Sequence, residues 1–265
     1  MTVPDTLATP AGYLESLFSL EGQLAVVTGA SQGIGLAIAE CLARAGADII
    51  GVSYDMPDGD SAARTVVEGL GRKFTPLCAD FSVREQVTEL AEDLAGRGVD
   101  ILINNGGTIR REPAAQHTDA DFDYVMDVNL RSTFVLSREV GRSMMTRGHG
   151  KIVNTASLLS FQGGVNVPGY TSSKSAVAGL TKALANEWAP LGVNVNAVAP
   201  GYVATANTKD LRADAARSQA ILERIPAGRW SEASDVAGAV LFLCSHAADY
   251  IHGIILPVDG GWLAR

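Results

Sequence analysis

Short apolar runs alternate with longer stretches of helical periodicity along almost the whole chain. Most of these runs are apolar at successive positions and rich in β-branched residues, which is typical of parallel strands that helices cover on both sides. A strict strand–helix alternation predicts a doubly wound α/β fold, in which right-handed crossovers join about seven parallel strands. The predicted strands are residues 24–28, 48–53, 74–78, 101–104, 151–155, 194–199 and 254–258, and the predicted helices include residues 34–45, 83–95 and 172–189.

The length and composition favour one domain. The chain has 265 residues, of which 47% are hydrophobic, and this is enough for one large core or two small ones. No internal repeat, low-complexity linker or shift in composition divides the sequence. We therefore expect a single domain over residues 21–265, preceded by an N-terminal arm of residues 1–20 that carries two prolines and lies over the body.

The charge and the cysteines limit the partners and the compartment. A net charge of −8 argues against a nucleic-acid partner, because binding phosphates needs a basic face. No uncharged apolar run approaches the roughly 18 residues of a membrane span, and no basic-then-apolar leader opens the chain. Three widely spaced cysteines predict a reducing cytoplasm rather than a disulfide framework. The histidines show no metal-ligand spacing, so no metal is expected; they are His117, His149, His246 and His252.

A glycine-rich segment follows the first predicted strand and opens the first helix. In the run Thr28 to Gly35, Gly29 permits a tight turn, while Gly33 and Gly35 let a pyrophosphate and a neighbouring strand approach the backbone. The free N–H groups of the helix N-terminus can then bind phosphate oxygens. This pattern predicts a Rossmann-type dinucleotide site, to which Ser31, Gln32 and Ile34 also contribute, although a glycine-rich turn without a ligand would look similar.

The same glycine-rich segment allows a second interpretation. Its first five residues from Gly29 also fit G-x-S-x-G, the nucleophile elbow of α/β-hydrolases, with Ser31 as nucleophile and a late His246 or His252 as base. The motif lies on the first strand, however, and this hypothesis leaves the tyrosine–lysine pair described next without a role. The hydrolase interpretation is therefore disfavoured.

A tyrosine and a lysine lie four residues apart in a predicted helix. Tyr170 and Lys174 therefore share one helix face. A phenol ionises near pH 10, and an ammonium group within about 4–6 Å favours the phenolate and lowers that pKa. Ser157 ends the fifth predicted strand, where strand ends meet a ligand crevice. Its hydroxyl could hold a substrate oxygen while Tyr170 exchanges the proton with the substrate.

Six ordered motifs resemble those of the short-chain dehydrogenase/reductase family, from about residue 20 to residue 265. They are T-G-x-x-x-G-x-G at 28–35, N-N-x-G at 104–107, Asn129, Ser157, Y-x-x-x-K at 170–174 and P-G-x-x-x-T at 200–205. The resemblance implies an NAD(P)-dependent enzyme that acts on CH–OH groups. It also implies a homo-tetramer, formed partly through paired long helices such as the one that carries Tyr170.

The resemblance assigns roles to individual residues. It implies that Tyr170 is the general acid/base, that Ser157 positions the substrate, that Lys174 binds the nicotinamide ribose and that Asn129 completes a proton relay. The cofactor-binding residues that it implies beyond the glycine loop are Asp80, Phe81, Asn105, Gly106, Gly107, Pro200, Gly201, Val203 and Thr205. One departure is that the family usually has alanine where this chain has Gly106, and we expect the missing methyl to loosen that loop slightly.

The choice between NAD and NADP depends on the end of the second predicted strand. An NAD-specific chain places an acid there to bond the ribose 2′-hydroxyl. Ser53 occupies the usual acidic position, and Asp55 lies on the same side if the strand continues that far. No cation for a 2′-phosphate is visible, and the glycine loop has Gln32 where NADP enzymes tend to place a base. The sequence therefore favours NAD without excluding NADP; alternatively, Asp55 is only a turn residue.

The substrate class rests on a narrower resemblance. Segments around Arg110, Phe161, Trp188, Arg224 and Trp262 are similar to the sugar-acid branch of the family, which oxidises keto-deoxy sugar acids or gluconate. Arg110 and Arg111 directly follow the N-N-G-G turn, and a guanidinium group suits a substrate carboxylate. Pairing with nearby acids such as Glu112 is the alternative. Gln162 and Tyr202 are further candidate substrate contacts. A different short-chain dehydrogenase activity and a dinucleotide-binding module without turnover remain open as alternatives.

Overall fold

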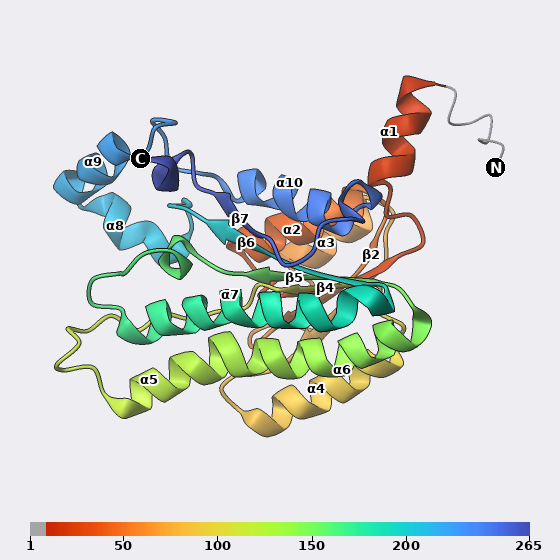
Figure 1. Cartoon of the computed structure of the whole chain (residues 1–265), viewed down its shortest axis with the longest axis horizontal. Helices are drawn as coiled ribbons and strands as arrows, with labels where there is room; N and C mark the ends of the chain where they lie inside the picture. Colours follow the sequence, from red (N-terminus) through yellow and green to blue (C-terminus); the bar gives the residue numbers. More distant parts are fainter. Residues whose placement is uncertain (1–8) are drawn as a thin grey trace.

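A single parallel sheet forms the centre of the molecule (Figure 1). The computed structural model describes residues 9–265, and its seven strands are ordered β3-β2-β1-β4-β5-β6-β7. The doubly wound α/β prediction is thus confirmed, and four of the seven predicted strands have the observed bounds. The strands are β1 (Leu24–Thr28), β2 (Asp48–Ser53), β3 (Phe74–Cys78), β4 (Ile101–Asn104), β5 (Gly150–Thr155), β6 (Val193–Pro200) and β7 (Ile255–Val258).

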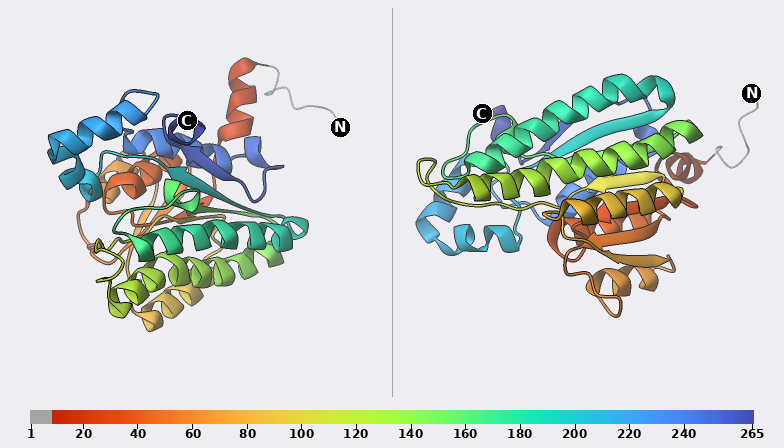
Figure 2. Two further views of the ribbon diagram at one scale, coloured as in Figure 1. Left: turned by 60° about the vertical axis from the view of Figure 1, so that its left-hand side comes forward. Right: turned by 90° about the horizontal axis from the view of Figure 1, so that it is seen from below.

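Helices cover both faces of the sheet, as Figure 2 shows from two sides. One hydrophobic core lies under α2, α3 and α10, and the other lies under α4, α6 and α7. The strands are apolar on both sides because both faces are buried in this way. The helices are α1 (Pro10–Phe18), α2 (Gly33–Arg44), α3 (Ala62–Gly69), α4 (Arg84–Gly96), α5 (Asp119–Met126), α6 (Ser132–Arg147), α7 (Pro168–Trp188), α8 (Lys209–Ala213), α9 (Ala215–Arg224) and α10 (Ala233–Cys244).

Two predictions about the helices need correction. Helix α7 begins at Pro168, four residues before its predicted start, because proline is favoured in the first turn of a helix. This places Tyr170 inside the first turn of α7. The N-terminal arm contains helix α1, which has no buried residue and projects from the body in Figure 1 rather than lying over it. Among residues 9–265, no helix has the length and apolarity that a bilayer crossing requires.

The order of the strands fixes where a ligand can bind. Strand β1 pairs with β2 on one side and with β4 on the other, so the chain reverses its direction of winding between β1 and β4. In open parallel sheets, ligands bind beyond the carboxyl ends of the strands at such a reversal. The glycine loop after β1 and the N-N-G-G turn after β4 both lie at this edge.

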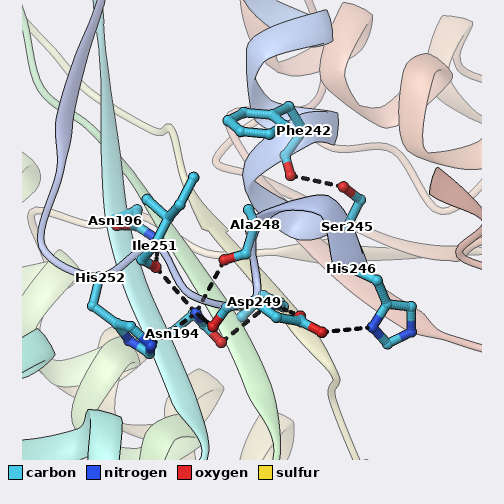
Figure 3. Close-up of polar contacts among 10 residues, drawn as sticks. Asn194, Asn196, Phe242, Ser245, His246, Ala248, Asp249, Ile251 and His252 are labelled. Carbon is cyan, nitrogen blue, oxygen red and sulfur yellow. Dashed lines mark hydrogen bonds and ion pairs between the residues drawn. The ribbon is translucent and has the colours of Figure 1, made fainter. Parts of the chain in front are cut away.

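At the opposite, amino-terminal edge of the sheet, the side-chain amide of Asn194 joins a loop to a strand. The Asn194 Nδ2 atom lies 3.0–3.3 Å from the carbonyl oxygens of Ala248, Asp249 and Ile251, and 3.3 Å from the Nε2 atom of His252 (Figure 3). Its Oδ1 atom accepts a hydrogen bond from Lys151. The side chain of Asn194 thus fixes the loop between α10 and β7 to the start of β6.

Replacing Asn194 by alanine is expected to destabilise the fold without changing the chemistry. The substitution leaves several loop carbonyls without their donor, and each unsatisfied buried group costs about 1–3 kcal/mol. Chemical denaturation of Asn194→Ala should show a loss of about that size, while the Michaelis constants stay unchanged because the site is at the other edge of the sheet. The exposed Asn207→Ala is the control. Equal stability of the two variants would contradict this role of Asn194.

Candidate functional site

The glycines of the loop after β1 stand at positions where a side chain would be strained or would clash. Gly29 and Gly33 have φ values of +67° and +59°, which L side chains rarely adopt. A Cβ atom on Gly35 would lie 2.0 Å from the carbonyl oxygen of Gly29. No side chain caps the first turn of α2, because Gln32 at the N-cap makes no capping bond. The backbone N–H groups of this turn, which includes Ile34, are therefore suited to the pyrophosphate of a dinucleotide.

The hydroxyl of Thr28 joins the glycine loop to the N-N-G-G turn. Its Oγ1 atom accepts hydrogen bonds from the backbone N–H groups of Asn105 (2.9 Å) and Gly106 (2.8 Å). The Asn105 side chain in turn donates to the Thr28 carbonyl at 2.9 Å. The glycine-rich motif includes Thr28 without predicting this role, although a polar residue at the end of an apolar strand is a visible signal.

The space of the missing methyl at Gly106 is occupied by another side chain, and the slight loosening of the loop stays a prediction. A Cβ atom built on Gly106 would lie 2.7 Å from Cε2 of Phe81 and 3.3 Å from the Thr28 hydroxyl oxygen. The ring of Phe81, which follows β3, already fills that space. Asp80 is exposed beside it, and its Oδ1 atom accepts hydrogen bonds from Ser82.

The segment after β6 closes the other side of the crevice. Gly201 packs so closely on Asp259 that a Cβ atom would lie 2.8 Å from its Cα atom. Val203 is buried, and the side chain of Thr205 comes nearest to Gly33. The structure therefore brings Thr205, at the end of the P-G-x-x-x-T motif, against Gly33 of the glycine loop.

Strand β2 does not end in the acidic residue that an NAD-specific chain places there to bond the ribose 2′-hydroxyl. Strand β2 stops at Ser53, whose buried hydroxyl accepts a hydrogen bond from the backbone N–H of Ser31 at 3.2 Å. Asp55 lies in an exposed turn beyond the strand. Strand β2 therefore does not continue to residue 55. Asp55 is a turn residue, which was the alternative interpretation of this position.

Tyr170 and Lys174 face each other on α7, as their spacing predicted. The Lys174 Nζ atom lies 5.7 Å from the centre of the Tyr170 ring and donates a hydrogen bond to the Thr155 carbonyl at 2.6 Å. Only 4% of Lys174 is exposed. The backbone carbonyl of Thr155 was not predicted as its partner, because a main-chain acceptor leaves no signal in the sequence.

Burial acts on both titratable groups of this pair. It raises the pKa of Tyr170 above its ordinary value, while a hydrogen bond from Ser157 and the positive charge of Arg111 act in the opposite direction. Burial lowers the pKa of Lys174 to about 8. We expected the lysine to bring the phenol pKa down, but in the free protein the cost of burying the phenolate prevails.

Asn129 lies in a π-helical turn (Asp127–Arg131) between α5 and α6. Such turns often mark functional positions because they widen the helix locally. The buried Asn129 amide donates to the Thr108 carbonyl and to the Ser173 hydroxyl, both at 3.0 Å, and accepts from the Thr108 N–H at 2.8 Å. Asn129 therefore ties the segment after Gly107 to α7, and Ser173 is a partner that sequence analysis missed.

The two neighbouring arginines have different surroundings. Arg110 pairs with Asp121 at 3.4 Å, and its guanidinium lies 4.3 Å from the centre of the Tyr124 ring. Arg111 is exposed and makes no ion pair with any residue between 9 and 265. Its positive charge acts to lower the pKa of Tyr170. Arg110 therefore pairs with a nearby acid, as the alternative interpretation predicted, although this acid is Asp121 and not Glu112. Arg111 is free to bind an anion.

Gln162 and Tyr202 are joined through a tryptophan that sequence analysis did not nominate. The Trp262 Nε1–H donates to Oε1 of Gln162 at 3.2 Å, and the Tyr202 ring lies 4.8 Å from the Trp262 ring. Trp262 packs in a small core with Leu158, which directly follows Ser157. Both substrate candidates therefore border the loop that carries Ser157.

The hydrolase interpretation is wrong. Ser31 follows β1 at the carboxyl edge of the sheet. His246 and His252 line a cleft of about 560 Å³ together with Gln23, Gly150 and other residues that begin or precede strands, so they lie at the opposite edge. His246 is bonded there to Asp249 (Figure 3). Neither histidine can serve Ser31 as a base.

The site combines a glycine-rich turn whose free N–H groups suit a dinucleotide with a serine, a tyrosine and a buried lysine that can hold and move a proton. This combination defines a nicotinamide-dependent oxidoreductase, in which the cofactor carries the hydride and the protein handles the proton. Comparison with known proteins agrees. A family model described as Enoyl-(Acyl carrier protein) reductase matches residues 29–263.

Two relatives match almost the whole chain. A 2-dehydro-3-deoxy-D-gluconate 5-dehydrogenase of Bacillus subtilis (strain 168) is 54% identical over 255 residues, covering 96% of this chain and 100% of the relative. A gluconate 5-dehydrogenase of Gluconobacter oxydans (strain 621H) is 39% identical over 249 residues, covering 92% and 96%.

Solved structures are similar over the same length. One, from Agrobacterium tumefaciens and assigned as a 2-deoxy-D-gluconate 3-dehydrogenase with bound NADP, has a TM-score of 0.89 at 52% identity and covers 94% of this chain and 99% of its own. A gluconate 5-dehydrogenase from Burkholderia cenocepacia J2315, in complex with NADP and tartrate, has a TM-score of 0.87 at 35% identity and covers 95% and 99%. The chain belongs to the short-chain dehydrogenase/reductase family and is an NAD(P)-dependent oxidoreductase of CH–OH groups.

Replacing Ser157 by alanine is expected to shift the pH profile of alcohol oxidation to higher pH. The substitution removes the hydrogen bond that lowers the pKa of Tyr170, so the phenolate forms at higher pH and the rising limb of the profile moves with it. The kcat should also fall by about 100-fold or more. Ser172→Ala, which alters an exposed serine of helix α7, is the control. A weaker but unshifted profile for Ser157→Ala would contradict this coupling.

Proposed function

We propose that this chain is a 2-dehydro-3-deoxy-D-gluconate 5-dehydrogenase, which transfers a hydride between NAD(P) and the secondary alcohol or ketone of a keto-deoxy sugar acid. Relatives from Bacillus subtilis (strain 168) and Escherichia coli (strain K12) with that name are 54% and 49% identical over nearly their full length. The feature of the site that supports the proposal is Arg111, which is exposed and makes no ion pair with residues 9–265, and whose positive charge acts to lower the pKa of the Tyr170 phenol. A substrate that carries both a carboxylate and a reacting hydroxyl fits these two groups.

Each catalytic role follows from a contact. Tyr170 takes the proton of the reacting hydroxyl during oxidation and returns it during reduction, while Ser157 bonds the phenol and holds the substrate oxygen. Lys174, anchored on the Thr155 carbonyl, presents its Nζ atom toward the phenol ring. Asn129 holds the segment around Thr108 against α7 and continues the polar path away from Tyr170. When bound, the nicotinamide ring supplies the hydride acceptor or donor.

The dinucleotide is held by the groups around the crevice. The first turn of α2 binds the pyrophosphate, the region of Asp80, Phe81 and Gly106 receives the adenosine side, and the stretch after Pro200 receives the nicotinamide side. The preference for NAD remains a prediction that rests on Asp55. Because Asp55 lies in an exposed turn and similar structures hold NADP, we propose that the chain accepts either dinucleotide.

The assembly and the compartment are also proposals. A homo-tetramer is proposed from the family resemblance, with the long helices α6 and α7, which lie side by side on one face in Figure 1, as contact elements. A cytoplasmic location is supported by three free cysteines, none of which pairs within the described part of the chain. These cysteines are Cys41, Cys78 and Cys244.

Arg111→Ala is expected to lower kcat/KM for 2-dehydro-3-deoxy-D-gluconate by about ten- to hundredfold, mainly through KM. A charge-assisted hydrogen bond contributes about 1.5–3 kcal/mol, and the substitution removes its donor. The KM for an uncharged secondary alcohol should stay within about twofold. Steady-state absorbance of the reduced cofactor measures all of these rates, with NAD and NADP in parallel.

Arg110→Ala is the matched control, because Arg110 is already engaged by Asp121 and Tyr124. It should leave the KM for the sugar acid close to that of the unchanged protein. If Arg111→Ala also spares that KM, the carboxylate contact is wrong. If the unchanged protein prefers gluconate or the uncharged alcohol to 2-dehydro-3-deoxy-D-gluconate, the proposed substrate is wrong.

A further inference from the structure

The side-chain amide of Gln162 has partners on one of its two ends. The indole N–H of Trp262 donates a hydrogen bond to the Gln162 Oε1 atom at 3.2 Å, and the Nη2 atom of Arg224 lies 3.5 Å from the same oxygen. Indole and guanidinium groups donate hydrogen bonds and do not accept them. The amide oxygen must therefore face Trp262 and Arg224, and the NH₂ group of Gln162 must face away from them.

The two donors are themselves held in place. Trp262 is only 4% exposed, and it packs with Leu158 and Ile221 in a small core. It belongs to a short 3₁₀ turn (Trp262–Ala264) that follows β7. The guanidinium carbon of Arg224, the last residue of α9, lies 3.9 Å from the centre of the Trp262 ring. A fixed indole thus sets the direction of the amide.

Gln162 borders the place where the substrate must lie. It follows the short turn that begins after Ser157, whose hydroxyl bonds the Tyr170 phenol. On its other side, the Trp262 ring lies 4.8 Å from the ring of Tyr202, in the stretch that receives the nicotinamide side of the cofactor. Gln162 is half-buried, and its side-chain hydrogen bonds within residues 9–265 involve only the oxygen. Its NH₂ group is therefore available to a ligand.

We infer that Trp262 is a positioning residue, which turns the Gln162 amide so that its NH₂ group donates a hydrogen bond to a hydroxyl oxygen of the substrate. A flipped amide would place its NH₂ group against two donors and leave the indole N–H without an acceptor, which is unfavourable for buried groups. This inference rests on the proposed function and adds a contact to a hydroxyl group besides the carboxylate contact of Arg111.

Trp262→Phe removes the indole N–H and keeps an aromatic ring. The KM of the substrate should rise about three- to tenfold, which is the effect of one neutral hydrogen bond. The kcat should stay within about twofold, because a contact made equally in the ground and transition states changes KM alone. Trp230→Phe is the control, since the Trp230 ring also packs on Tyr202, at 5.5 Å. Equal KM values for the two variants would overturn the proposal.

A double-mutant cycle separates positioning from packing. Gln162→Leu removes the amide and should raise KM at least as much as Trp262→Phe does. In the Gln162→Leu background, Trp262→Phe should change KM by less than about twofold, because no amide is left to orient. The same effect of Trp262→Phe in both backgrounds would mean that the ring acts by packing alone, and this would overturn the proposal.

Gln162→Glu tests the direction of the amide. A carboxylate still accepts hydrogen bonds from Trp262 and Arg224, but it cannot donate one. The midpoint of thermal unfolding should therefore be kept or rise, while KM rises at least about threefold. An unchanged KM would overturn the proposal. If Trp262→Phe does not fold, the two variants of Gln162 decide the test, because that side chain is only half-buried.

The choice of substrate keeps this test separate from the proposed function. The constants are measured with whichever of 2-dehydro-3-deoxy-D-gluconate, gluconate and an uncharged sugar alcohol the unchanged protein oxidises with the highest kcat/KM. All three carry hydroxyl groups, so the cycle can be read with any of them. A preference for gluconate or the sugar alcohol would contradict the proposed substrate, while an additive cycle would contradict the role of Trp262.

Discussion

The Thr28 hydroxyl holds together the two turns on which the site depends. Thr28 is the last residue of β1, at the place where the winding of the sheet reverses. Its hydroxyl oxygen accepts hydrogen bonds from two N–H groups of the turn after β4. Because these turns belong to neighbouring strands, the hydrogen bonds fix the position of the glycine loop relative to the N-N-G-G turn. The two turns that flank the switch point of the sheet, where ligands bind in such folds, are thus held in one arrangement.

The second constraint is electrostatic. A half-buried phenol and an almost fully buried ammonium group share the first turns of α7, and burial opposes the charged form of each. Such an arrangement is unfavourable for the free protein, and it is tolerated where it serves function. Ser157 and Arg111 offset part of the cost at Tyr170. When the oxidised cofactor is bound, its nicotinamide ring adds a further positive charge that would favour the phenolate form of Tyr170.

Features that depend on local sequence patterns could be predicted, whereas contacts between residues far apart in the sequence could not. Strands buried on both faces produce continuous apolar runs, so the sheet followed from the sequence, and a spacing of four residues placed Tyr170 and Lys174 on one helix face. Which of Arg110 and Arg111 is free could not be predicted, because Asp121 and Tyr124 on α5 approach only in the fold. The acceptor of Lys174 is a main-chain atom, which any residue could supply.

The central claim is that the phenol becomes a usable base only when the oxidised cofactor is bound. Isotope labelling of tyrosine ring carbons, with Tyr170→Phe to assign the signal, allows the Tyr170 pKa to be measured by NMR with and without NADP⁺. We expect a pKa above the ordinary tyrosine value in the free protein and a fall below that ordinary value in the complex. The same pKa in both states, or a value near neutral without the cofactor, would contradict it.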